Sequence, residues 1–194
     1  MKTRNRFLTA FLIFITATGF AVEKPKMNIV SNSPDKAFVS FELDTVCPIQ
    51  ITIMNDAGEF LYSWTSKTPQ LKFNKVFDFS NVGCGKYKVY FDCGEQSLTR
   101  DLNVMQKQIG IGPEVQLHKP FFRYSDGKLN LSFLNVALKS VYINIYKNGE
   151  YVTGLNLGKE LDVQKRFDFS KLDKGEYEVV LSDFFSEHYY MVRK

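Results

Sequence analysis

The chain repeats itself, and this repeat limits the available folds more than any other feature of the sequence. Four short segments recur in the same order, namely residues 37–41 at 129–133, 55–60 at 147–151, 78–80 at 168–170 and 85–89 at 175–179. The offset falls from 92 to 90 along the chain, as expected when loops lose residues after a duplication. Each copy spans about 80 residues, the size of one small domain, so we expect two tandem domains.

The repeat also sets the expected domain boundaries. The first domain is predicted over residues 27–105 and the second over residues 114–194. Residues 106–113 between them are polar, contain glycine and end in proline, which is typical of a connector. A connector this short does not let domains tumble freely, so we expect a hinge.

Apolar residues alternate with polar ones, which is the period of β-strands. Ile49, Ile51 and Ile53 alternate with Gln50 and Thr52, and similar rows recur in the second copy. No apolar row has helical spacing over three turns. The strands of the second copy are expected near residues 114–117, 128–133, 140–146, 150–157, 163–169, 175–181 and 188–193. Seven short strands per copy predict an all-β protein of two tandem immunoglobulin-like (fibronectin-III-like) β-sandwiches.

One local motif sharpens this prediction. Residues 173–177 read Asp-Lys-Gly-Glu-Tyr, between the fifth and sixth expected strands. This resembles the tyrosine corner of immunoglobulin-like sandwiches, in which a Tyr hydroxyl bonds to nearby backbone. The first copy keeps Tyr87 where the second has Tyr177, although glycine replaces the aspartate. We therefore expect structural tyrosine corners at both residues.

The strand order assigns the three cysteines. Cys47 precedes the third strand and Cys93 follows the sixth, and these strands are antiparallel neighbours in such a sandwich. A Cys47–Cys93 disulfide is therefore predicted. Cys84 lies at the far end of the sixth strand, too distant to bond. It is either a small residue in a tight turn, which we prefer, or a reactive thiol.

The first residues predict an exported protein. Lys2, Arg4 and Arg6 precede a short apolar run and a small-residue exit, so residues 1–21 are expected to be a cleaved signal peptide. The run is shorter than the roughly 20 residues of a transmembrane helix, and no later segment approaches that length. The formal charge of +4 falls to near +1 without these three residues (22 basic against 21 acidic). No basic stripe remains for nucleic acid, so we expect no nucleic-acid partner.

The sequence offers little chemistry. The only histidines, His118 and His188, belong to no recognisable catalytic or metal-binding spacing. Asp78 and Asp168 occupy equivalent positions in the two copies, so a structural role is expected for both. We therefore expect no enzyme, no metal and no cofactor.

Aromatic residues are the one feature that could support binding, at 15% of the chain. Those expected to face away from the core, as candidate binding aromatics for a protein or a glycan, are Tyr62, Trp64, Tyr142, Tyr146, Tyr189 and Tyr190. Packing between the domains, or a second layer that covers strand edges, is the alternative role, and the one we prefer. A non-enzymatic binding or structural protein, secreted, periplasmic or at the cell surface, is the function expected from these features.

The second copy also resembles a known family. Residues 167–179 (Phe-Asp-Phe-Ser-Lys-Leu-Asp-Lys-Gly-Glu-Tyr-Glu-Val) and the basic end Val192-Arg193-Lys194 are similar to the C-terminal sorting domains of type IX secretion cargo. They are equally similar to small exported immunoglobulin-like proteins of bacteria. The first resemblance implies that residues 189–194 are recognised by the secretion machinery. The motif occurs twice here, and the proline-rich opening of sorting domains is absent.

Overall fold

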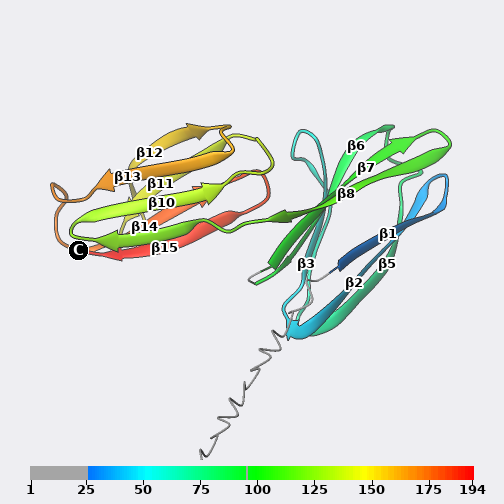
Figure 1. The fold of residues 1–194 in the computed structure, drawn as a ribbon, viewed down its shortest axis with the longest axis horizontal. Helices are drawn as coiled ribbons and strands as arrows, with labels where there is room; N and C mark the ends of the chain where they lie inside the picture. Colours follow the sequence, from blue (N-terminus) through cyan, green and yellow to red (C-terminus); the bar gives the residue numbers. More distant parts are fainter. Residues whose placement is uncertain (1–25, 95) are drawn as a thin grey trace, which may run out of the picture.

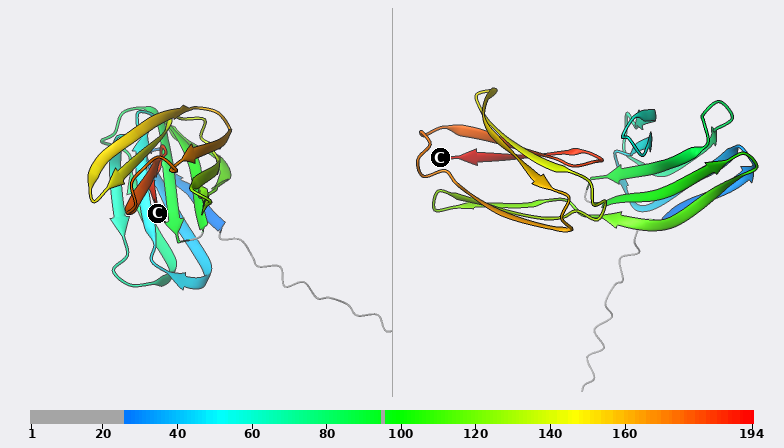
Figure 2. Two further views of the ribbon diagram at one scale, coloured as in Figure 1. Left: turned by 90° about the vertical axis from the view of Figure 1, so that its left-hand side faces the viewer. Right: turned by 90° about the horizontal axis from the view of Figure 1, so that it is seen from above.

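The computed structural model describes residues 26–94 and 96–194, and every regular element in that part of the chain is a β-strand (Figure 1). The strands form two sandwiches, which lie end to end in Figure 2. The prediction of two tandem immunoglobulin-like sandwiches is confirmed. The signal peptide expected at residues 1–21 lies outside the described residues.

The first domain is built from eight strands. They are β1 (Lys26–Ser33), β2 (Lys36–Cys47), β3 (Gln50–Asn55), β4 (Phe60–Thr65), β5 (Gln70–Asp78), β6 (Gly85–Cys93), β7 (Gln96–Met105) and β8 (Gln108–Leu117). One sheet has the order β1-β2-β5 and the other β4-β3-β6-β7-β8. The alternating rows meet between the sheets, where Ile51, Val89 and Phe91 are fully buried and Phe41 stacks on Phe91 with ring centroids 4.0 Å apart. Each such side chain contributes about 1.5–3 kcal/mol on burial.

The second domain repeats this plan with seven strands. They are β9 (Phe121–Ser125), β10 (Lys128–Leu134), β11 (Val141–Lys147), β12 (Glu150–Gly158), β13 (Asp162–Asp168), β14 (Glu176–Ser182) and β15 (Glu187–Arg193). Its sheets have the orders β13-β10-β9 and β12-β11-β14-β15. The registers match between the copies, since Lys36 pairs with Asp78 in one and Lys128 with Asp168 in the other. Positions in the two domains can therefore be compared one by one.

Residues 106–113 are not the expected linker. They form the turn after β7 and the first part of β8, which pairs antiparallel with β7 as a fifth strand of that sheet. The second half of β8 contains residues 114–117, which were expected to open the second domain; that domain begins instead at β9. The polar residues and Pro113 suggested a connector, but Ile109 is buried in the core and Ile111 packs against it. Proline is tolerated here because β8 is an edge strand.

Side-chain hydrogen bonds fasten β8 across the sandwich. The Arg100 guanidinium donates to the carbonyl oxygens of Gly112 and Met27, each at 3.0 Å. The Met27 amide donates to the Glu114 carboxylate at 2.7 Å. The hinge expected at residues 106–113 is thus part of the first domain, and only residues 118–120 link β8 to β9.

The cross-link and the first tyrosine corner lie at opposite ends of β6, and the second tyrosine corner lies at the start of β14. Cys47 and Cys93, the pair that the strand order brings together, form a disulfide with Cα atoms 5.8 Å apart. The Tyr87 hydroxyl donates to the Gly83 carbonyl at 2.7 Å, and the Tyr177 hydroxyl donates to the Asp173 carbonyl at 2.8 Å. Cys84 is a free, exposed thiol beside the first of these turns.

Candidate functional site

The outer face of the sheet β12-β11-β14-β15 carries a row of exposed aromatic side chains. Tyr142 and Tyr146 point outward from β11 because Val141, Ile143 and Ile145 between and beside them fill the core. Tyr151 on β12 lies opposite Tyr146, and Tyr189 and Met191 project from β15 on the same side. We call the set Tyr142, Tyr146, Tyr151, Tyr189 and Met191 the tyrosine face.

Most of the tyrosine face is open to solvent. Exposed fractions are 46% for Tyr142, 62% for Tyr151, 60% for Tyr189 and 53% for Met191. The rings of Tyr146 and Tyr151 meet edge to face with centroids 5.9 Å apart. Single exposed apolar residues are ordinary, but a contiguous group on one sheet is typical of a binding surface.

Gly154 leaves room for two side chains beside the backbone of β12. A Cβ at this position would collide with Asn144 Oδ1 and would lie 2.8 Å from the Tyr151 hydroxyl and 3.0 Å from the Ile143 carbonyl oxygen. Only glycine admits the Tyr151 side chain and Asn144 so close to the backbone of β12. The sequence pattern had not singled out Tyr151 or Gly154.

Carboxylates give the tyrosine face an acidic character. Glu178 pairs with Tyr146 on β11 and with Met191 on β15, and Glu187 precedes Tyr189 by two residues on β15. The Tyr189 hydroxyl donates to Glu187, and this hydrogen bond is the main reason that the pKa of Tyr189 is raised above its usual value. The face therefore combines aromatic rings with acceptors for hydrogen bonds.

Three of the candidate binding aromatics belong to the core instead. Tyr62 packs edge to face on Phe77 at 4.9 Å, and Trp64 lies 5.3 Å from Phe73, both at the side of the first core. They face inward because β4 pairs with β3 so that Tyr62 and Trp64 lie opposite the buried Ile53 and Ile51. Because β4 is an edge strand, its inward side chains are only partly buried. The sequence pattern therefore did not mark Tyr62 and Trp64 as residues that face the core.

Tyr190 is the third candidate that faces the core and not the solvent. It packs against the second core and stacks on Phe122 with centroids 5.2 Å apart and planes 16° from parallel. Consecutive residues of a strand point to opposite faces, so Tyr189 and Tyr190 cannot share a surface. The structure thus brings together Tyr142, Tyr146 and Tyr189 of the six candidates.

The turn between β14 and β15 contacts the first domain. Phe185 stacks on Tyr90 of β6, and Phe184 lies within 3.5 Å of the Cβ position of Gly58. Lys139 of the second domain donates to the Asp56 carbonyl oxygen at 3.4 Å, and Lys119 forms an ion pair with Asp92 at 3.6 Å. Packing between the domains, the alternative role considered for the aromatics, is what Phe184 and Phe185 do.

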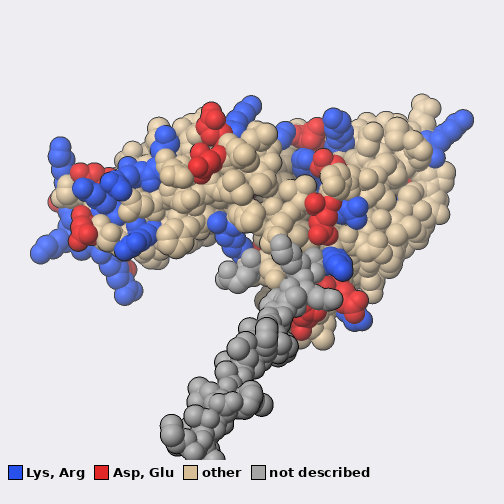
Figure 3. All heavy atoms as spheres, in the orientation of Figure 1, with Lys and Arg blue, Asp and Glu red and all other residues tan. Residues whose placement is uncertain are grey.

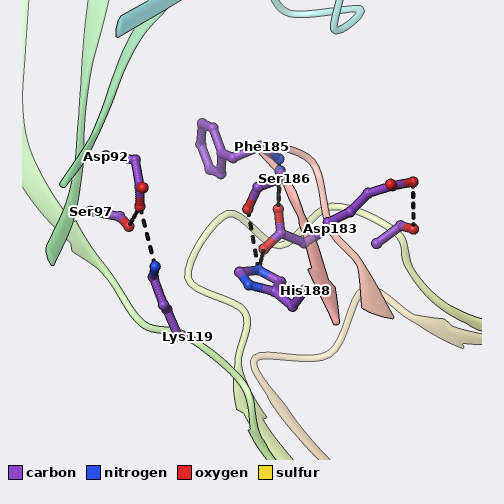
Figure 4. A network of polar contacts seen from close by, with 9 residues as sticks. Asp92, Ser97, Lys119, Asp183, Phe185, Ser186 and His188 are labelled. Atoms are coloured by element: carbon purple, nitrogen blue, oxygen red, sulfur yellow. Dashed lines mark hydrogen bonds and ion pairs between the residues drawn. The ribbon is translucent and has the colours of Figure 1, made fainter. Parts of the chain in front are cut away.

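A network around Asp183 holds this turn in shape (Figure 4). Asp183 Oδ1 accepts the amides of Phe185 at 2.6 Å and Ser186 at 2.9 Å. Its Oδ2 lies 3.0 Å from His188 Nε2, which is also 3.2 Å from Ser186 Oγ. A catalytic triad places the serine and the acid on different ring nitrogens. Here both contact Nε2, so the trio fixes the loop and is not arranged for nucleophilic attack.

Burial beneath the turn between β14 and β15 shifts the pKa of Tyr90. Desolvation, followed by the nearby charge of Asp92, raises the pKa of the Tyr90 hydroxyl to about 12. The phenol is thus kept neutral where the domains meet.

Among the described residues, no three His, Cys, Asp or Glu side chains are grouped closely enough to hold a metal ion. No helix in the described part is long and apolar enough to cross a membrane.

Comparisons with known proteins concern the fold alone. No family model matches the sequence, and a search of curated proteins gives no match. Among solved structures, the chain is similar to the BSP domain of a biofilm-associated protein (12% identity, TM-score 0.28), covering 88% of this chain but only 29% of that one. It is also similar to the FN1-FN3 domains of chicken CNTN1 (9%, TM-score 0.31), covering 87% and 66%, and to the ligand-binding domain of human OSCAR (7%, TM-score 0.26), covering 86% and 94%.

Proposed function

We propose that the chain is an exported, non-enzymatic binding module whose tyrosine face binds a partner protein. The observation that carries the proposal is the group of open tyrosines and Met191 on one sheet of the second domain. Tyrosine and methionine are enriched in the contact regions of protein interfaces, where rigid rings supply large contact areas at low entropic cost. The predicted signal peptide and the disulfide fit an oxidising compartment.

The charge of the tyrosine face specifies the kind of partner. Glu178 and Glu187 lie among the rings, and the nearest cation on this side, Arg193, pairs with Glu176 at 2.9 Å. A partner surface with basic residues around an apolar centre would complement it. The docked turn at Phe185 supports the proposal further, because it would present the face in a fixed orientation on the first domain.

Site-specific photo-crosslinking in the native cell tests this proposal. A benzoylphenylalanine at Met191 lies on the tyrosine face, and one at Val76, an exposed position on β5, is the matched control. We expect a protein adduct from position 191 and none from position 76. With the identified partner purified, Tyr189→Ala should weaken binding about tenfold, or roughly 1.4 kcal/mol.

Two results would overturn the proposal. One is adduct formation that is equal at both positions or absent at 191. The other is glycan binding that Tyr189→Ala abolishes in the absence of any protein adduct, which would make the tyrosine face a carbohydrate-binding surface.

A further inference from the structure

The second domain has another open surface on its opposite side. A groove of about 530 Å³ crosses the outer face of the sheet β13-β10-β9. The side chains that define this arginine groove are Phe121, Arg123, Asn130, Ser132, Gln164 and Arg166. All six point outward, because Leu129, Leu131 and Phe133 of β10 point into the core.

Two arginines flank the middle of the groove. Asn130 on the central strand pairs with Arg123 of β9 on one side and with Arg166 of β13 on the other. The backbones of the two arginines are therefore two strand spacings apart, or about 10 Å. Arg166 Nε donates to Asn130 Oδ1 at 2.8 Å, which holds its guanidinium over the centre of the sheet.

These arginines have no acidic partner, in contrast to some other surface cations of the chain. Arg193 pairs with Glu176 at 2.9 Å, and Lys88 pairs with Asp101 at 2.5 Å. Within the described part of the chain, neither Arg123 nor Arg166 forms an ion pair. Figure 3 shows further Lys and Arg side chains, with some Asp and Glu among them, at the end of the second domain far from the first. An anion entering the groove meets unneutralised charge.

The first domain shows that the fold does not require these arginines. The equivalent row on its sheet β1-β2-β5 is Val30, Phe38 and Val76, in the same register. Both copies keep the neighbouring Lys–Asp pair, Lys36 with Asp78 and Lys128 with Asp168. The two domains thus share the sheet and differ at the arginine row.

We propose that the arginine groove binds an acidic polysaccharide, with Arg123 and Arg166 each holding a carboxylate or sulfate group. A guanidinium pairs with such groups through two parallel hydrogen bonds. Ser132 and Gln164 supply a hydroxyl and an amide for sugar hydroxyls. The Phe121 ring, 65% exposed at the end of the groove, offers an apolar surface for the C–H face of a sugar ring.

Two other anionic ligands fit the groove less well. A nucleic acid needs a long basic stripe that neutralises many phosphates, whereas three basic residues, Arg123, Lys165 and Arg166, line this short groove. A single small anion could contact the arginines, but it would leave Ser132, Gln164 and the Phe121 ring of the groove without a contact. The site is separate from the tyrosine face, since it lies on the other sheet of the domain.

Calorimetry on the full chain without its signal peptide tests this proposal. The probes are polygalacturonate and chondroitin sulfate, which separate carboxylate from sulfate recognition, with dextran and duplex DNA as neutral and nucleic-acid controls. We expect binding to at least one acidic polysaccharide, weakening with added salt. The double variant Arg123→Ala/Arg166→Ala should lose about tenfold per arginine.

Matched variants separate the groove from general basicity. Lys159→Ala/Lys174→Ala removes two exposed charges outside the groove and should bind as the parent does. Arg123→Lys/Arg166→Lys keeps the charge but not the paired hydrogen bonds, and should bind several-fold more weakly. Tyr189→Ala should leave saccharide binding unchanged. Unchanged melting temperatures will show that the exposed substitutions leave the fold intact.

Several outcomes would overturn the proposal. They are the absence of binding to both acidic polysaccharides, equal binding to duplex DNA, an equal loss in the Lys159/Lys174 variant, and undiminished binding by the lysine-for-arginine variant.

Discussion

Phe185 of the second domain stacks on Tyr90 of the first, with ring centroids 5.2 Å apart and planes 18° from parallel. Tyr90 lies on the outer face of β6, a position that faces solvent in an isolated sandwich, yet it is buried. The Asp183 carboxylate shapes the turn that carries Phe185 by accepting two of its amides. The orientation of the domains therefore depends in part on this aromatic contact and on the turn that carries it, together with the contacts of Phe184 and Lys139.

Phe185→Ala should expose Tyr90. Burial raises the Tyr90 pKa to about 12, so the stabilisation of the neutral phenol is complete below the unfolded value of about 10 and is lost as pH rises through 12. Without the Phe185 ring, the pKa should fall toward 10. The Tyr90 pKa is measured by tyrosinate absorbance titration, as the difference between the protein and its Tyr90→Phe variant. The same difference is then measured in the F185A background. Phe121→Ala is the control, and a Tyr90 pKa that stays at about 12 in F185A would contradict this role.

Loss of the Cys47–Cys93 disulfide should destabilise the first domain. The bond links positions 46 residues apart, which corresponds to about 4 kcal/mol of loop-closure entropy in the unfolded chain. We expect Cys47→Ser/Cys93→Ser to lower the free energy of unfolding of the first domain by about that amount, measured as a lower denaturant midpoint. Cys84→Ser should have no comparable effect because Cys84 is free and exposed. Equal midpoints for the parent and the double variant would refute this expectation.

Ser170→Ala should raise the pKa of Asp168. The Ser170 side chain and its amide, the latter at 2.8 Å, are the main causes of the lowered pKa of this exposed carboxyl group. A depressed folded pKa gives stability above the unfolded value of about 3.9 that is lost as pH falls through the folded pKa. The variant should lose less stability on acidification below about pH 4. Carboxyl NMR titration checks the pKa, and Ser80→Ala should shift Asp78 while leaving Asp168 unchanged.

Gly154→Ala should disrupt the tyrosine face. Its methyl group would overlap Asn144 and crowd the Tyr151 hydroxyl, so one of these side chains must move. We expect a loss of about 1–3 kcal/mol of unfolding free energy and weaker partner binding. The control is Gly83→Ala, whose methyl group would meet no atom within 4 Å. If G154A is as stable as G83A and binds the partner with unchanged affinity, the close approach of Asn144 and Tyr151 to the backbone of Gly154 is not required.

The intact mass of the native protein tests the sorting-domain resemblance. If the second domain is a cleaved export signal, the released form should end near residues 118–120, because β8 belongs to the sheet of the first domain. A full-length chain retained in the cell, two mass units light for one disulfide, would exclude that interpretation.

Sequence patterns predicted the local features well for a physical reason. The two-residue period at Ile49, Ile51 and Ile53 reflects which side of a strand meets the core, and that choice is made within a few residues. Pairing of Cys47 with Cys93 follows from strand order alone. The tyrosine corner also depends on local geometry, since each hydroxyl reaches a carbonyl four residues earlier.

Contacts between residues that are distant in sequence determined the features that the sequence patterns did not predict. Tyr62 and Tyr142 were both expected to face away from the core, yet Tyr62 packs against Phe77 and Tyr142 is exposed, because the pairing of β4 with β3 turns Tyr62 to the inner face of its sheet. Residues 106–113 have the composition of a linker, but the Arg100 guanidinium bonds both Gly112 and Met27, which is remote in sequence, and so holds them in place as part of β8. The arginine groove joins three strands whose residues lie up to 45 positions apart (Phe121 to Arg166), a separation that no local pattern records. The sequence by itself determined the all-β class, most of the strands and the duplication, whereas only tertiary packing decided which residues of the edge strands face the core and which outward residues remain open to a partner.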